Sequence, residues 1–184
     1  MTSRVVFIQG AGEGAWDEDA LLVASLAEHL GDGFVVDFPR MPREDDPDDD
    51  RWLPAVDAAI AHGAAPVVLV GHSLGGYLLL KHLAAASIPS PIAAICIIAA
   101  PFPGGDADWV FDGFELPAGF AGRLPADAAV LLYASEDDEV VPFAHRDLYA
   151  AAIPGAVTRT TVGGHQLAGN LEAVARDIRL VVDG

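Results

Sequence analysis

Six apolar runs, each of strand length, alternate along the chain with longer segments in which apolar residues recur at helical spacing. Within the runs the apolar residues are nearly continuous, which is typical of strands covered on both faces. Such strands, joined by helices, require right-handed crossovers, so the pattern predicts a doubly wound α/β fold around a mainly parallel sheet of six strands with helices on both faces. The predicted strands are Val5–Gln9, Phe34–Phe38, Pro66–Gly71, Ile92–Ala99, Ala129–Ser135 and Val157–Thr161.

The segments between these runs supply the predicted helices. With 184 residues, 52% of them hydrophobic, the chain can fill one core, and we expect a single domain over residues 1–184. Residues 101–125 break the alternation, because they are rich in Gly, Pro and aromatic residues and follow the fourth predicted strand. Loops of that length in a compact domain are usually functional or mobile, so we interpret this one as a short lid-like segment. The predicted helices are Asp19–Leu30, Leu53–Ala61, Gly75–Ala86, Phe143–Ala151 and Leu171–Val182.

The charge of the chain excludes two classes of partner. The formal net charge is −17, and Lys81 is the single lysine beside nine arginines. Binding to nucleic acid or to an anionic membrane surface would be electrostatically costly, so neither is expected as a partner. The apolar run at the N-terminus is too short for a signal peptide, which predicts a cytoplasmic protein, and the sequence leaves the oligomeric state open. Cys96 lies in an apolar run, where a buried and inert residue is expected.

The segment VVLVGHSLGGYLLL, residues 67–80, combines a buried strand, a Gly71-His72-Ser73-Leu74-Gly75 turn and the start of a helix. This is the G-x-S-x-G pattern in the context that gives it meaning, because the serine at the centre of a strained strand-to-helix turn projects away from the sheet. Only glycine fits two residues before and two residues after such a serine. The pattern therefore predicts that Ser73 is a nucleophile.

A serine nucleophile requires a histidine base and a carboxylate that orients it. His165 lies in a loop flanked by glycines before the last predicted helix, whereas His29, His62, His82 and His145 fall within helix patterns and are expected at helix surfaces. The fifth predicted strand is followed at once by four carboxylates, Glu136, Asp137, Asp138 and Glu139. The chain order of serine, acid and histidine is the one that the G-x-S-x-G fold requires.

The segment QGAGEGAW, residues 9–16, has two interpretations. Its Gly10-x-Gly12-x-x-Ala15 spacing fits a dinucleotide-binding loop, and Asp37 closes the next apolar run as that motif requires. The acidic residues Asp17, Glu18 and Asp19 speak against it, because carboxylates at the start of a helix would repel a pyrophosphate. The alternative is that the backbone of this segment binds a substrate oxyanion.

The phrases GHSLGG, SEDDEVVP and GGHQL resemble the α/β-hydrolase superfamily, over essentially the whole chain. The small size resembles the compact serine hydrolases of the YdeN and retinoblastoma-binding protein 9 family, which have no large cap domain. The resemblance implies a strand order of about 2-1-3-4-5-6. It also implies that Asp138, four residues before Pro142, is the acid, with Asp137 as the alternative, and that the backbone N–H groups of Ala11 and Leu74 form the oxyanion hole.

The predicted activity is that of a serine hydrolase which cleaves a small ester, thioester or similar acyl substrate through Ser73, His165 and Asp138. This chemistry requires neither a metal nor an organic cofactor, and the expected partner is the small-molecule acyl substrate. Gln9, Phe102 and Trp109 are the candidate substrate contacts. Two alternatives remain, namely a noncatalytic hydrolase-fold module that binds a ligand or protein, and a dinucleotide-binding protein.

Overall fold

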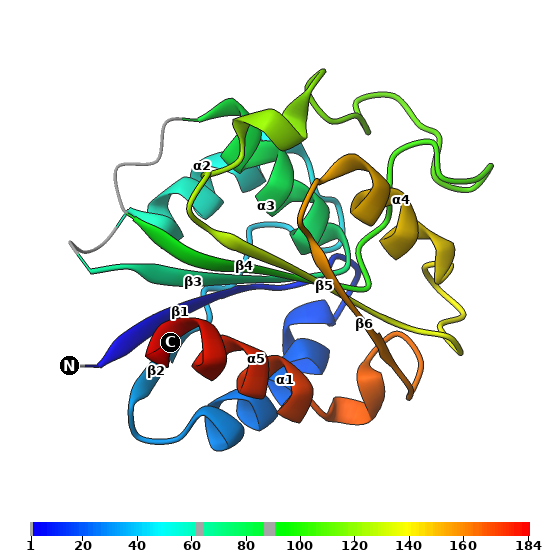
Figure 1. Cartoon of the computed structure of the whole chain (residues 1–184). Coiled ribbons are helices and arrows are strands. Elements are labelled where there is room, and N and C mark those ends of the chain that lie inside the picture. Colours follow the sequence, from blue (N-terminus) through cyan, green and yellow to red (C-terminus); the bar gives the residue numbers. More distant parts are fainter. Residues whose placement is uncertain (1, 62–64, 87–90) are drawn as a thin grey trace.

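A six-stranded sheet forms the centre of the computed structural model, which describes residues 2–61, 65–86 and 91–184. The strand order is β2-β1-β3-β4-β5-β6, and each neighbouring pair is parallel, which confirms the predicted fold class and strand order (Figure 1). The order reverses direction between β1 and β3, so the carboxyl ends of these two strands flank the crevice in which open α/β sheets bind ligands. The strands are β1 (Ser3–Ile8), β2 (Phe34–Asp37), β3 (Val67–His72), β4 (Ile92–Ile98), β5 (Ala129–Ser135) and β6 (Val157–Thr161).

Helices cover both faces of the sheet (Figure 1). Along β1, Val5 and Phe7 face the cluster formed with α1 and α5, whereas Val6 and Ile8 face the cluster formed with α2, α3 and α4. Because successive side chains of a strand point to opposite faces, a continuous apolar run fills both cores at once. The helices are α1 (Ala15–Leu30), α2 (Asp49–Ile60), α3 (Leu74–Ala85), α4 (Ala144–Ala152) and α5 (Glu172–Asp183), with short 3-10 turns η1 (Phe120–Arg123) and η2 (Leu167–Gly169).

Two helices begin four residues earlier than the sequence predicts. Helix α1 starts at Ala15 rather than Asp19, because the left-handed Gly14 ends the preceding turn and the acidic residues lie within the first turns of the helix. Helix α2 starts at Asp49 rather than Leu53, because the side chain of Asp48 accepts a hydrogen bond from the Arg51 N–H and caps the helix. Of the described helices, none is long and apolar enough to cross a membrane.

Residues 101–125 cover the end of the sheet and are anchored to α3 and α4. Tyr149 donates a hydrogen bond of 2.7 Å to the Pro101 carbonyl, and His145 accepts one of 2.8 Å from the Phe102 N–H. The other ring nitrogen of His145 donates to Asp106 at 2.9 Å. His145 is thus buried and links α4 to the 101–125 segment, which corrects the prediction that it lies at a helix surface. His82 is also buried, and His62 lies outside the described residues. That residues 101–125 act as a lid stays a prediction.

Candidate active site

Ser73 occupies the turn between β3 and α3 with a backbone φ of 52°. An L-amino acid rarely adopts this left-handed conformation, so the turn is strained, and the bond from the Ser73 N–H to the Ile98 carbonyl at 2.8 Å helps to hold it. A Cβ at Gly71 would lie 2.6 Å from the Gly76 Cα, and one at Gly75 would lie 2.0 Å from the Gln9 carbonyl oxygen. Close approach of backbone segments therefore dictates the glycines of the G-x-S-x-G pattern.

His165 and Asp138 form a hydrogen-bonded pair beside the cleft that Ser73 also lines. The distance from His165 Nδ1 to Asp138 Oδ2 is 2.9 Å. Burial by itself raises the pKa of Asp138, but the bond from His165 and the N–H groups of Val140 and Val141 outweigh burial and hold that pKa below its ordinary value. The ionised carboxylate accepts a hydrogen bond from the Nδ1–H group of His165, which leaves the other ring nitrogen, Nε2, to act as a base.

Asp137, the alternative acid, has a different role in the structure. Its carboxylate accepts hydrogen bonds from the N–H groups of Gly163 and Gly164 at 3.0 and 3.1 Å, and these bonds lower its pKa. Gly163 has a φ of 103°, so the loop turns sharply just before His165. Asp137 therefore shapes the histidine loop, while Asp138 is the carboxylate that bonds to the imidazole.

Two backbone N–H groups beside Ser73 have no hydrogen-bond partner within residues 2–61, 65–86 and 91–184. One belongs to Ala11 and the other to Leu74, the first residue of α3, which has no acceptor inside its own helix. A Cβ at Gly10 would lie 3.2 Å from the Ser73 Cβ, so the loop that carries Ala11 packs directly against the serine turn. Both N–H groups are therefore available to an acceptor in the cleft; that they form an oxyanion hole stays a prediction.

Gln9 holds this loop in place and does not contact the cleft. Its side chain is fully buried, and its amide donates to Glu44 at 2.7 Å and accepts from the Met41 N–H at 2.9 Å. The expectation that Gln9 contacts substrate is therefore wrong, because both ends of its amide are bonded inside the protein. Glu44 also accepts from the Trp16 N–H at 2.9 Å, and its carbonyl accepts from the Gly12 N–H at 2.7 Å.

A second histidine–carboxylate pair lies beneath the cleft. His72 Nδ1 lies 2.9 Å from Asp19 Oδ1, and both side chains are 1% exposed. The other ring nitrogen, Nε2, lies 3.0 Å from the carbonyl oxygen of His165. Because a carboxylate and a carbonyl only accept hydrogen bonds, this geometry favours a His72 ring that is protonated on both nitrogens.

Asp19 connects three segments of the site through its two carboxylate oxygens. It accepts from His72, from the Gly10 N–H at 2.8 Å and from the Gln166 amide at 3.1 Å. Burial acts to raise the pKa of Asp19 and to lower that of His72, but the contacts of the pair outweigh it, so the pKa of Asp19 is lowered and that of His72 is raised. Strand β3, the N-terminal loop and the loop that carries His165 are thus connected through the buried carboxylate of Asp19.

The cleft around Ser73 has a volume of about 530 Å³. Trp109 and Phe111 line it from the 101–125 segment, so Trp109 stays a candidate substrate contact. Phe102 does not line it, because its ring packs edge-on against Tyr149 at a centroid distance of 4.9 Å, and that expectation is corrected.

Sequence reasoning missed the inward side chain of Asp19 and the buried carboxylate of Glu44. Asp19 occupies the same stripe of α1 as the buried Leu22, Leu26 and Leu30, at spacings of three and four residues. A carboxylate on an apolar stripe needs a partner, so this spacing was the available signal. Glu44, in an acidic run that otherwise faces solvent, gave no such signal.

The N-terminal loop has little capacity left for a pyrophosphate. The Gly10 N–H is bonded to Asp19 and the Gly12 N–H to the Glu44 carbonyl. These are the groups that a dinucleotide loop would offer to phosphate. Among the described residues, no cluster of three or more His, Cys, Asp or Glu side chains could hold a metal ion.

The comparisons with known proteins agree with this fold. Residues 5–182 match the model of the alpha/beta hydrolase family. The ydeN gene product of B. subtilis superposes over 100% of both chains with a TM-score of 0.72 and 21% identity. Est1E from Butyrivibrio proteoclasticus gives a TM-score of 0.72 and 18% identity over 100% of this chain and 89% of its own. No curated protein matches the sequence.

A putative hydrolase of the α/β superfamily from Xanthomonas campestris is similar as well, with a TM-score of 0.63 and 23% identity over 99% of this chain and 98% of its own. The family model covers nearly the whole chain, and the sheet order, the serine turn and the compact size agree with it. The chain therefore belongs to the α/β-hydrolase family and has the compact fold of the YdeN type.

Proposed function

We propose that this protein is a serine hydrolase that cleaves a small ester, thioester or similar acyl substrate. The observation that supports the proposal most is the 2.9 Å bond between His165 and Asp138 at the cleft that also holds the strained Ser73 turn. Base, orienting acid and nucleophile come from three separate loops at the carboxyl edge of the sheet. A purely structural role would not require all three at one edge of the sheet.

In the proposed reaction, His165 Nε2 takes the proton of the Ser73 hydroxyl while the serine oxygen attacks the substrate carbonyl. The N–H groups of Ala11 and Leu74 stabilise the negative charge on the carbonyl oxygen. Asp138 keeps Nδ1 of His165 protonated and stabilises the imidazolium that forms. The imidazolium then protonates the leaving alcohol or thiol, and the acyl group stays on Ser73.

Deacylation uses the same groups with water as the nucleophile. His165 takes a proton from the water, the resulting hydroxide attacks the acyl-serine carbonyl, and the carboxylic acid leaves as Ser73 regains its proton. Neither step changes an oxidation state, so the proposed reaction requires no oxidant or reductant.

The test compares the parent with Ser73→Ala on p-nitrophenyl acetate and with a fluorophosphonate probe, which labels activated serines. We expect labelling of the parent alone and a decrease in kcat by a factor on the order of 10⁴ in the variant. If Ser73→Ala hydrolyses the ester as fast as the parent, Ser73 is not the nucleophile. If neither protein is labelled or active, the proposal fails and a binding module becomes the better account.

A further inference from the structure

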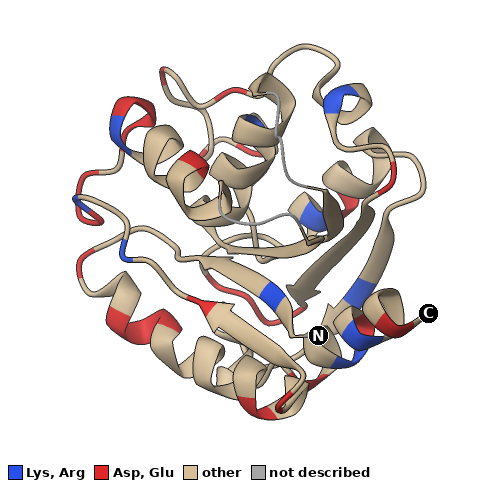
Figure 2. Cartoon of the chain, turned by 90° about the vertical axis from the view of Figure 1, so that its left-hand side faces the viewer, with Lys and Arg blue, Asp and Glu red and all other residues tan. Residues whose placement is uncertain are grey.

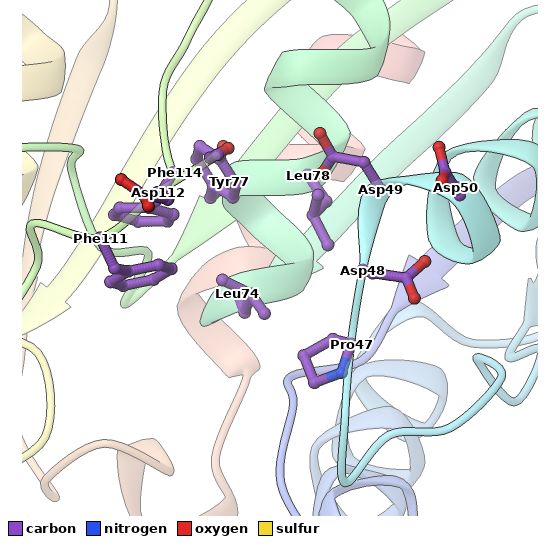
Figure 3. A pocket seen from close by; sticks show the side chains of 11 residues that line it. Pro47, Asp48, Asp49, Asp50, Leu74, Tyr77, Leu78, Phe111, Asp112 and Phe114 are labelled. Atoms are coloured by element: carbon purple, nitrogen blue, oxygen red, sulfur yellow. The ribbon is translucent and has the colours of Figure 1, made fainter.

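A second pocket adjoins the Ser73 cleft. Its volume is about 380 Å³, near the lower end of the usual range for small-molecule sites. Figure 3 shows Leu74, Tyr77 and Leu78 of α3 between aromatic rings on one side and an acidic turn on the other. We call this cavity the Phe111 pocket; it is lined by Pro47, Asp48, Asp49, Asp50, Leu74, Tyr77, Leu78, Phe111, Asp112, Gly113 and Phe114.

The position of the Phe111 pocket defines which part of a substrate it can receive. It shares Pro47, Leu74 and Phe111 with the Ser73 cleft, but neither His165 nor Gln166 lines it. In the proposed reaction His165 protonates the leaving group, so the leaving group must lie on the histidine side of the serine. The acyl group must then extend away from His165, and the Phe111 pocket, which Leu74 lines and His165 does not, is placed to receive it.

One wall of the pocket consists of aromatic rings that pack on one another. Phe111 stacks on Phe114 with ring centroids 4.4 Å apart, and Tyr77 packs on Phe114 at 4.3 Å. The ammonium of Lys81 donates to the Gly113 carbonyl at 2.8 Å and to the Tyr77 hydroxyl at 3.0 Å, which joins the 101–125 segment to α3. An apolar group can therefore replace water against preformed rings at little cost in ordering the protein.

The rim of the pocket is negatively charged. Asp48 pairs with Arg51 and Asp49 pairs with Lys81, each at 2.5 Å. Within the described part of the chain, Asp50 and Asp112 have no ion-pair partner. Acidic residues are distributed over many elements of the chain (Figure 2), in keeping with its net charge of −17. An acyl chain that ends in a carboxylate would meet repulsion at this rim.

We propose, on the basis of the proposed hydrolase function, that the Phe111 pocket binds the acyl group of the substrate. Its substrates carry an apolar acyl group without negative charge, of more than two carbons. The alcohol or thiol part occupies the His165 side of the cleft. Phe111 is then a specificity-determining residue, and Asp50 with Asp112 excludes anionic acyl groups.

The first experiment measures kcat/KM for the p-nitrophenyl esters of acetate, butyrate and hexanoate. Burial of each added methylene should raise kcat/KM by up to about fourfold. In Phe111→Ala the ratio of hexanoate to acetate hydrolysis should fall by roughly tenfold. Val110→Ala is the matched control, because Val110 is exposed in the same segment but lines neither cavity. A flat dependence on chain length, or equal effects of the two variants, would overturn the proposal.

The second experiment compares the p-nitrophenyl esters of hexanoate and of adipate, whose chains have equal length but differ in a terminal carboxylate. The adipate ester should react at least about tenfold more slowly at low salt. Asp112→Asn should reduce the ratio of hexanoate to adipate hydrolysis by roughly threefold, and added salt should do the same. Asp127→Asn, at an exposed site outside both cavities, should leave it unchanged. Equal rates for the two esters in the parent would contradict charge exclusion.

The outcomes separate this proposal from the proposed function. Fluorophosphonate labelling and loss of acetate hydrolysis in Ser73→Ala test the nucleophile without involving the acyl pocket. If both results hold while the chain-length series is flat, the acyl-pocket proposal alone is wrong. If Ser73→Ala remains active, the proposed function fails whatever the chain-length series shows.

Discussion

Replacement of Asp19 by asparagine removes one charge from the buried pair and nearly preserves the shape of the side chain. In the parent the carboxylate bonds to His72 at 2.9 Å, with both side chains 1% exposed. In Asp19→Asn, the charged His72 would have no counter-ion. Breaking a buried pair by removing one partner costs about 3–5 kcal/mol. His72 can limit the cost by losing a proton, so we expect the free energy of unfolding to fall by about 3 kcal/mol at pH 6.

The effect should depend on pH with a definite sign. The pKa of His72 is raised in the folded protein, so its stabilisation is complete below about pH 6.5 and is lost as the pH rises through the folded value. The pKa of Asp19 is lowered, so its stabilisation is present above about pH 4 and is lost as the pH falls. The difference between parent and Asp19→Asn should therefore be largest between about pH 4 and 6.5 and should shrink by pH 8.5.

Urea unfolding followed by circular dichroism at pH 6 and pH 8.5 provides the measurement, with Asp127→Asn as an exposed control that should change the free energy by less than about 0.5 kcal/mol. Unchanged m-values would show that the variants unfold between comparable states. A difference below about 1 kcal/mol at pH 6, or one that does not shrink by pH 8.5, would refute the assignment of a charged His72–Asp19 pair.

Two further pairs of substitutions test the local geometry. Asp138→Asn should lower kcat by a factor on the order of 10⁴, because asparagine favours the wrong tautomer of His165. Asp137→Asn should lower kcat much less, since it alters only the turn before His165. Steady-state kinetics on one ester compares the two variants. Equal losses would mean that the two carboxylates share the role. Gly75→Ala places a Cβ 2.0 Å from the Gln9 carbonyl oxygen and should yield little folded protein, as judged by thermal unfolding. Gly122→Ala, which has open space at the Cβ, should unfold like the parent. A normal transition in Gly75→Ala would contradict the close approach.

Much of the fold was predictable because it depends on local pattern. Continuous apolar runs indicated strands covered on both faces, and β5 and β6 have the predicted bounds. The starts of α1 and α2 were less predictable, because they depend on a left-handed glycine and on one capping bond from Asp48. Such features involve single residues and produce no periodic signal.

The candidate site likewise has parts that the sequence predicts and parts that it does not. Ser73 and His165 could be proposed as candidates from the chain, because a strained serine turn requires glycines at fixed spacing and a candidate base follows the candidate acid in a fixed order. The partner of His165 could not be derived from the run of four carboxylates alone, since neighbouring residues point in different directions once the strand ends. The structure assigns the imidazole bond to Asp138 and the loop turn to Asp137.

The sequence by itself determined the class of fold, the strained serine turn and the chain order of the candidate residues, because periodicity and glycine spacing act over short stretches of chain. Only the tertiary structure decided that Gln9 and Phe102 are internal supports, that Asp19 and His72 form a buried pair, and that a pocket opens beside Leu74. These features depend on contacts between segments that are far apart in the chain, and burial changes the role of each group by removing it from water.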